Sequence, residues 1–296
     1  MSPTADSLPP LHPRNKEFRW PSVKSGASFE EAGIGLTYLT AMQAEQFDRD
    51  GFIVLSGIFD PHLIRELTEV IDAHESEYVD RIALKPASER TAKDDTAAAV
   101  FMPHLVAVSS VVRSFCASPV FGEIATDLLG PSVRVYWDQA VYKKSERPRE
   151  FPWHQDNGLV YIEPQNYLTC WVPLTPAHRR NGCLWLLAGQ HRRGMLDHEE
   201  TPDGLRCRLI DTADAIAVEL LPGDLLVFSS LTPHRSGPNM SSAPRKALIV
   251  QYGLDGSTVF RDPDLGIHDD MLMDDPVRQY YIARNGRPVA PEPLEF

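Results

Sequence analysis

Residues 217–228 have the sequence Ala-Val-Glu-Leu-Leu-Pro-Gly-Asp-Leu-Leu-Val-Phe, in which a Pro222-Gly223-Asp224 turn joins two short apolar runs. Short apolar runs bounded by Pro and Gly are typical of β-strands. The same pattern recurs through the second half of the chain. The further strands that it predicts cover residues 133–141, 167–174, 184–187 and 247–252.

Helical patterns occupy the first half of the chain. Thr40 is expected to cap a helix that Gly51 ends, before a buried strand at 52–55. Asp60-Pro61 is expected to open a second helix to about Tyr78, and a third is expected over about 110–129. Helices followed by many short strands predict a mainly β fold, a sandwich or barrel of antiparallel strands buttressed by N-terminal α-helices.

Three segments lack a clear period. Residues 1–36 are rich in Pro, Ser and charge and are expected to form an extended arm, and residues 256–296 are expected to wrap the surface without regular structure. Residues 85–103 are small and polar with weak periodicity, so they are expected to be either disordered or a functional lid. A single domain is expected over residues 37–255.

The composition narrows the class of function. The chain has 296 residues and a formal net charge of −12, which argues against nucleic-acid binding. Its four cysteines form no CxxC pair and are expected to be reduced thiols of a cytoplasmic protein. No apolar stretch is long enough for a membrane span. The acidic surface does not exclude an anionic substrate, because a local basic pocket can form in an acidic protein.

Residues 151–156, Phe-Pro-Trp-His-Gln-Asp, carry the first chemical motif. His154 and Asp156 are two residues apart, so on a strand both would face the same side. A distant His234 completes two imidazoles and one carboxylate, the ligand set of non-haem Fe(II) oxygenases. A bare His-x-Asp also occurs by chance, so the hypothesis depends on the residues that accompany it.

Arg245 is the residue that strengthens this hypothesis. A turn at Gly237-Pro238-Asn239 would let a strand ending near His234 return from Arg245, bringing the guanidinium toward the metal. Such an Arg can clamp the far carboxylate of 2-oxoglutarate, and Ser236 could add a hydroxyl donor. The alternative is an exposed charge at the start of a strand.

The chain resembles the phytanoyl-CoA dioxygenase family of Fe(II)/2-oxoglutarate oxygenases. The matching stretches run in family order over residues 36–255, and they are 50–55, 151–156, 168–174, 181–184, 221–224, 234–239 and 244–245. The resemblance implies a double-stranded β-helix, also called a jelly-roll or cupin-like core. One departure is Ala188-Gly189-Gln190-His191, where the family usually has Pro-Gly-Ser-His; it concerns only a loop.

The same resemblance assigns roles to residues. It implies that His154, Asp156 and His234 hold iron, and that Arg245 and Ser236 hold the 2-oxoglutarate co-substrate. It further implies that Trp171 packs beside the co-substrate and that Gln139, with Lys144 as a second candidate, contacts it. O2 would be the other co-substrate.

The expected reaction is hydroxylation of a small organic molecule, possibly a secondary metabolite, with 2-oxoglutarate converted to succinate and CO2. Related halogenases have a small residue in place of Asp156, so the carboxylate argues for oxidation. Desaturation, epimerisation, ring closure and endoperoxide formation remain open, as does a non-catalytic binding protein on the same scaffold. His104, which follows the expected lid, is the candidate substrate contact.

Overall fold

The computed structural model describes residues 18–20, 35–89, 94–158, 160–208, 210–260 and 271–294. Two antiparallel sheets, one of eight strands and one of four, form its centre. They face one another, because a buried apolar cluster joins Trp171 and Phe228 of the larger sheet to Leu184 and Leu186 of the smaller one. The expected mainly β, jelly-roll-like core with flanking helices is confirmed.

The larger sheet has the strand order β1-β11-β6-β13-β3-β16-β17, with β2 paired to β3. Its strands are β1 (Phe52–Leu55), β11 (Leu225–Ser229), β6 (Leu168–Pro173), β13 (Arg245–Leu254), β3 (Val133–Lys143), β16 (Tyr281–Arg284), β17 (Arg287–Pro288) and β2 (Ala99–Pro103). The smaller sheet has the order β10-β7-β12-β4. Its strands are β10 (Ile216–Val218), β7 (Leu184–Leu186), β12 (His234–Ser236) and β4 (Phe151–His154).

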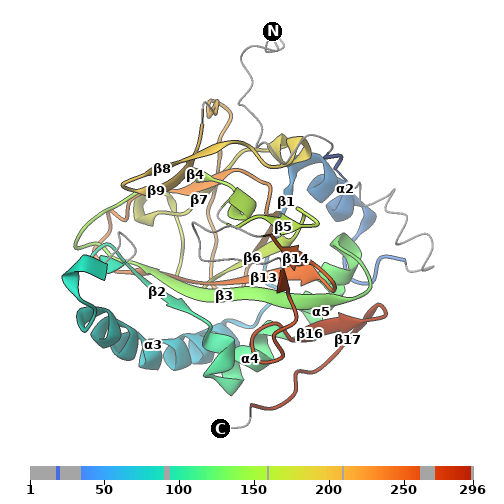
Figure 1. Cartoon of the computed structure of the whole chain (residues 1–296), viewed down its shortest axis with the longest axis horizontal. Helices are drawn as coiled ribbons and strands as arrows, with labels where there is room; N and C mark the ends of the chain where they lie inside the picture. Colours follow the sequence, from blue (N-terminus) through green and yellow to red (C-terminus); the bar gives the residue numbers. More distant parts are fainter. Residues whose placement is uncertain are drawn as a thin grey trace.

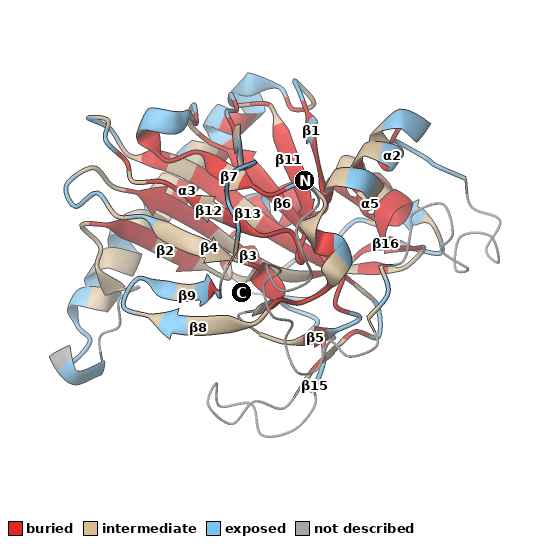
Figure 2. Cartoon of the chain, turned by 90° about the horizontal axis from the view of Figure 1, so that it is seen from above, coloured by how far each residue is buried: buried red, intermediate tan, exposed pale blue. Residues whose placement is uncertain are grey.

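Short strands complete the β structure. A three-stranded sheet contains β15 (Met271–Leu272), β14 (Thr258–Val259) and β5 (Ile162–Glu163). A separate hairpin consists of β8 (His198–Thr201) and β9 (Gly204–Cys207). This β8–β9 hairpin lies near β4, and the residues of its two strands are exposed or half-buried except Cys207, which is buried (Figure 2).

Among the described residues, four α-helices flank the larger sheet, and α3 and α4 lie on its side away from β4 and β7 (Figure 1). The helices are α2 (Ala41–Asp50), α3 (Pro61–Ala83), α4 (Ser110–Cys116) and α5 (Pro119–Leu128). Ile64 and Leu67 of α3 belong to the same buried cluster as Cys170 and Val172 of β6. Trp171, between those two strand residues, faces the smaller sheet instead, because successive strand side chains alternate.

The expected helix boundaries hold where a local cap sets them. The Thr40 hydroxyl accepts a hydrogen bond from the backbone N–H of Gln43 and so caps the start of α2. Gly51 ends α2 with a φ of 82°, a left-handed conformation that glycine adopts without strain. Asp60 caps α3, which continues past Tyr78 to Ala83. The single helix expected over 110–129 is two helices, and Pro119 begins the second at a position that needs no backbone N–H.

The segment expected as a lid, residues 85–103, ends inside the larger sheet. Ala99–Pro103 forms β2, which pairs with β3, and Val100 and Met102 are fully buried. Val100 and Met102 therefore belong to the core, whereas Phe101 and Pro103 on the other face of the strand are only partly buried, because successive strand side chains alternate. A lid over the preceding residues stays a prediction.

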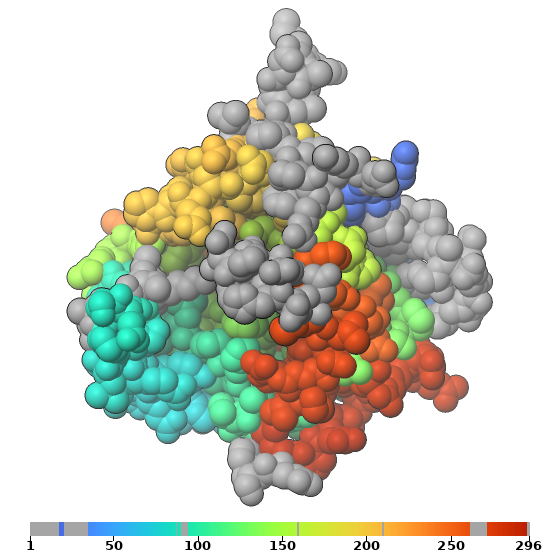
Figure 3. Space-filling view, viewed as in Figure 1, coloured from blue at the N-terminus to red at the C-terminus, as the bar shows by residue number. Residues whose placement is uncertain are grey.

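The two chain ends also differ from the expectation. Residues 256–296 are not irregular throughout: β16 pairs with β3, and Ile282 is buried in the main core. Figure 3 shows other C-terminal residues, in orange and red, spread over one side of the molecular face in view. Most of the expected arm, residues 1–17 and 21–34, lies outside the described residues. Among the described helices, none is long and apolar enough to cross a membrane.

Candidate active site

The two candidate histidine ligands come from adjacent strands of the smaller sheet. His154 ends β4, His234 begins β12, and the two are register partners in an antiparallel ladder. Asp156 Oδ1 lies 3.8 Å from His154 Nε2 and 3.6 Å from His234 Nε2. One ligand atom from each residue lies within 4.8 Å of the others, so the three side chains could hold a metal ion.

Asp156 lies beside the two histidines, but its backbone conformation differs from the strand that its spacing predicts. Strand β4 stops at His154, and Asp156 begins a 3₁₀ turn, η5 (Asp156–Gly158). The intervening Gln155 is fully buried, where its amide donates to the carbonyls of Gly194 and Leu231. The turn, rather than strand alternation, therefore aims the carboxylate at the histidines.

Backbone carbonyls orient both imidazoles. His154 Nδ1 lies 2.8 Å from the Pro152 carbonyl oxygen, and His234 Nδ1 lies 3.0 Å from that of Thr232. A carbonyl can only accept, so each Nδ1 carries the proton and each Nε2 keeps its lone pair. Burial, together with His234, lowers the pKa of His154 to about 4. Both effects favour the neutral imidazole that a metal needs.

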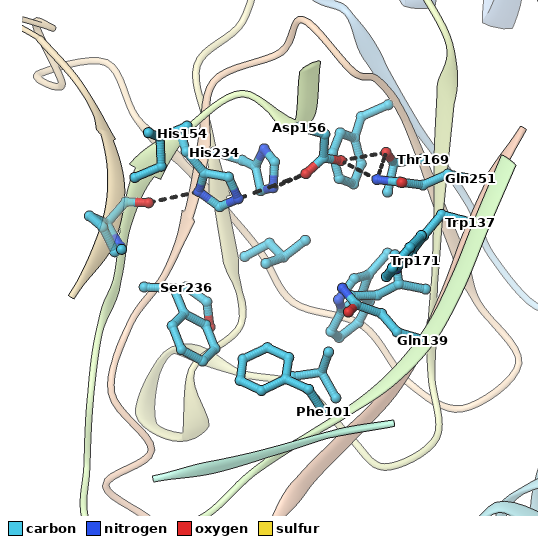
Figure 4. Close-up of a pocket in the computed structure, with 18 of the residues that line it drawn as sticks. Phe101, Trp137, Gln139, His154, Asp156, Thr169, Trp171, His234, Ser236 and Gln251 are labelled. Carbon is cyan, nitrogen blue, oxygen red and sulfur yellow. Dashed lines mark hydrogen bonds and ion pairs between the residues drawn. The ribbon is translucent and has the colours of Figure 1, made fainter. Parts of the chain in front are cut away.

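The carboxylate of Asp156 is oriented in the same way. Its Oδ2 accepts hydrogen bonds from Thr169 Oγ1 at 2.5 Å and from Gln251 Nε2 at 3.0 Å (Figure 4). Oδ1 is thereby left facing the two imidazoles. Sequence reasoning missed both donors, because Thr169 on β6 and Gln251 on β13 meet Asp156 only when the strands pair.

Arg245 begins β13 and its side chain is almost fully buried. Its Nη2 donates to Ser236 Oγ at 3.1 Å, while Nε and Nη1 have no partner among the described residues. Burial lowers its pKa to about 10, so it stays charged at neutral pH. Buried, unsatisfied guanidinium donors are costly unless an anion meets them, and a carboxylate such as that of 2-oxoglutarate fits them.

The strands that bring Arg245 to the site are also arranged differently from the sequence expectation. Strand β12 begins at His234 rather than ending there, and it belongs to the smaller sheet, whereas β13 belongs to the larger one. Arg245 therefore meets Ser236 across the space between the sheets. Its guanidinium lies 5.2 Å from the centre of the Trp171 ring, which the sequence analysis placed beside the co-substrate.

Ser236 is fully engaged by protein groups. Its hydroxyl donates to the Gly182 carbonyl at 2.9 Å and accepts from Lys143 Nζ, also at 2.9 Å, and from Arg245. In this arrangement its one proton is used, so Ser236 orients Arg245 rather than donating to a ligand. Lys143, which sequence reasoning missed, is fully buried, and its pKa is lowered to about 6 by burial and by Arg245.

The neighbouring Lys144 points elsewhere. It forms an ion pair with Glu75 of α3, as expected for the next residue along a strand, which faces the opposite side of the sheet. Lys144, the second candidate for a co-substrate contact, is therefore not brought to the site.

A cavity of about 410 Å³ connects these groups. Aromatic side chains dominate its wall: Phe101, Tyr136, Trp137, Phe151, Tyr167, Trp171 and Phe228. Figure 4 shows His154, His234 and Asp156 along one side of the cavity, with Phe101 across from them. Gln139 of β3 also lines it, whereas His104 does not and packs against Trp137 at 4.4 Å between ring centroids.

Comparison with known proteins identifies a family model, phytanoyl-CoA dioxygenase, that matches residues 47–247. The methylphosphonate hydroxylase of Gimesia maris is 27% identical over 222 residues, 73% of this chain and 81% of that protein. The ectoine dioxygenase of Bordetella parapertussis is 27% identical over 244 residues, 72% of this chain and 75% of that one.

A solved structure shows the same likeness. The apoform of EctD from S. alaskensis is 27% identical to this chain and superposes with a TM-score of 0.58. The match covers 73% of this chain and 77% of that one.

Proposed function

The chain belongs to the phytanoyl-CoA dioxygenase family, and on that premise we propose that it hydroxylates a C–H bond of a small organic molecule. It is an Fe(II)/2-oxoglutarate-dependent oxygenase, and His154, Asp156 and His234 are its proposed iron ligands. The observation that carries the assignment is a single cavity lined both by this ligand set and by the buried Arg245 with two unpartnered nitrogens.

Each side chain has a definite task in this proposal. Iron with 2-oxoglutarate and O2 supplies the oxidation, and 2-oxoglutarate leaves as succinate and CO2. Arg245 binds the far carboxylate of 2-oxoglutarate, and Ser236 holds Arg245 in place. Trp171 lies beside Arg245, Gln139 lines the same cavity, and both are proposed to contact the co-substrate. His104 does not line the cavity but packs against Trp137, which does, so its proposed influence on the substrate is through Trp137.

Two observations narrow the outcome of the reaction. Asp156, as the proposed third protein ligand, argues against halogenation, and two relatives, named a hydroxylase and a dioxygenase, favour hydroxylation among the oxidations. Desaturation, epimerisation, ring closure and endoperoxide formation use the same site. Product mass separates most of them: a gain of one oxygen indicates hydroxylation, and a loss of two hydrogens indicates desaturation or ring closure.

The first test is made without oxygen. Fe(II) and 2-oxoglutarate are added to metal-free protein, and a weak charge-transfer band is expected near roughly 500–530 nm, because the site leaves coordination positions open. His154→Ala should abolish the band. Arg245→Gln should weaken it at limiting 2-oxoglutarate, whereas Arg49→Gln, a change at an exposed arginine of α2, should not.

Absence of the band in folded wild-type protein would favour the alternative, a non-catalytic binding protein on this scaffold. A band with unchanged 2-oxoglutarate affinity in Arg245→Gln would remove Arg245 as the anchor.

A cytoplasmic location and the absence of a nucleic-acid partner complete the proposal. Four buried free cysteines and a net charge of −12 support it. Cell fractionation and a nucleic-acid shift assay test these two points.

A further inference from the structure

The acidic and basic side chains that line the cavity fall into three groups among the described residues. His154, Asp156 and His234 form the metal site, and Arg245 anchors the co-substrate. The only remaining charged side chains of the described lining are Arg149 and Asp203. When metal and co-substrate are bound, Arg149 and Asp203 are therefore the charged side chains that a substrate would contact.

Arg149 and Asp203 neutralise each other. Arg149 Nε lies 3.2 Å from Asp203 Oδ1, and Arg149 Nη2 donates to the Pro202 carbonyl at 2.9 Å. The Arg149 side chain is only 17% exposed, whereas that of Asp203 is 66% exposed. A lining residue as exposed as Asp203 lies where the cavity meets solvent, so the ion pair sits at the cavity mouth.

The ion pair belongs to a hairpin that is fixed to the metal site at its other end. Asp203 lies in the turn of the β8–β9 hairpin, and Gly204 and Leu205 of β9 also line the cavity. At the base of the hairpin, His198 Nε2 accepts a hydrogen bond from the backbone N–H of Gln155 at 3.1 Å and lies 3.3 Å from Cys207 Sγ. The hairpin therefore covers the cavity between the metal loop and the mouth.

The polar groups of the wall offer little to a charged ligand. Thr169 and Gln251 are committed to Asp156. Tyr136 and Tyr167 also line the cavity, and their rings pack together at 5.1 Å between centroids. A phenol hydroxyl can donate to, or accept from, one neutral polar group of a ligand.

We propose that the substrate is a compact, uncharged, ring-bearing molecule, and that the Arg149–Asp203 ion pair excludes charged molecules of the same shape. This inference rests on the proposed function. Aromatic walls bind rings by stacking and by burial of apolar surface, and a cavity near the low end of the usual range of roughly 300–1,000 Å³ favours a compact ligand. A charged ligand would lose its hydration and meet no unpaired opposite charge.

The test compares three probes of one shape on protein loaded with Fe(II) and 2-oxoglutarate without oxygen. The probes are neutral 2-naphthol, anionic 2-naphthoate and cationic 2-naphthylmethylamine, and binding is measured by equilibrium dialysis. Because 2-oxoglutarate then occupies Arg245, 2-naphthol should bind at least about fivefold more tightly than either charged probe, the factor for roughly 1 kcal/mol.

Two variants test the ion pair itself. Asp203→Asn removes the negative charge that pairs with Arg149. Binding of anionic 2-naphthoate should therefore become about fivefold tighter, whereas the affinity for 2-naphthol should not change. Arg149→Gln should improve 2-naphthylmethylamine binding in the same way. The matched control is Asp95→Asn, which breaks an ion pair with Arg147 that does not line the cavity and should change none of the three affinities.

A charged probe that binds wild type as tightly as 2-naphthol, failure of 2-naphthol to bind, or unchanged 2-naphthoate binding in Asp203→Asn overturns the inference. If the charge-transfer band forms in these samples, the oxygenase assignment survives that result. If the band is absent as well, the result contradicts the proposed function itself, and the inference that rests on it falls with it.

Discussion

His234 lies directly opposite His154 in the antiparallel pairing of β12 with β4, and their ring centroids are 4.3 Å apart. Directly paired residues project to the same face of a sheet, so the backbone ladder itself brings the two imidazoles together. The register shifts between His234 and Ser236, an irregularity of the kind that re-aims side chains near active sites. The metal site is thus built on a sheet rather than on loops alone.

The Thr169 hydroxyl should strengthen metal binding. Thr169→Val keeps the shape of the side chain but removes the 2.5 Å hydrogen bond to Asp156 Oδ2. Fe(II) or Zn(II) affinity should fall about tenfold, because partners that orient a ligand contribute roughly 10- to 100-fold. Competition with a chromogenic chelator measures it. Thr169→Ser, which retains the hydroxyl, should bind metal nearly as wild type does; equal loss in both variants would contradict the role.

The Ser236 hydroxyl should matter for 2-oxoglutarate rather than for the chemical step. Ser236→Ala removes an acceptor from Arg245 and from Lys143. The KM for 2-oxoglutarate should rise about tenfold with a smaller change in kcat, since a hydrogen bond to a charged group contributes roughly 1.5–3 kcal/mol. Succinate release measures both constants. Ser56→Ala, at an exposed turn after β1, is the control. An unchanged KM would show that Arg245 holds its position alone.

Asp138 should make stability depend on pH. Burial raises the pKa of Asp138 to about 7, well above its unfolded value near 4. The folded state therefore binds more protons between these values, and the free energy of unfolding should fall as pH rises from about 4 to about 7. Asp138→Asn should flatten this part of the profile, as measured by denaturant midpoints. An equally steep profile in the variant would assign the effect to other groups.

Gly158 should be needed for the contact between the metal loop and the β8–β9 hairpin. A Cβ at this position would lie 2.5 Å from Cε1 and 2.6 Å from Nε2 of His198. Gly158→Ala should lower the free energy of unfolding by about 1–3 kcal/mol, as overpacking does. The loss should shrink in a His198→Ala background, which makes room for the methyl group. Equal losses in both backgrounds would place the strain elsewhere.

Local sequence patterns determined the parts of this protein that depend on near neighbours. The cap at Thr40, the end of α2 at Gly51 and the Pro-Gly turn before β11 follow from residues within a few positions. The metal trio and Arg245 could also be named from sequence, because their side-chain types suit one chemistry. Spacing alone did not show that Asp156 leaves the strand or that Arg245 comes from the opposite sheet.

Only the tertiary structure decided which residues support and limit that chemistry. Thr169 and Gln251 reach Asp156, Lys143 rather than Lys144 reaches Ser236, and Asp203 meets Arg149 at the cavity mouth. The physical reason is that these contacts depend on sheet pairing and on the face that each strand buries. A shift of one residue in register would reverse every such face. Local sequence patterns indicate single strands and turns, but they do not show which distant strands pair.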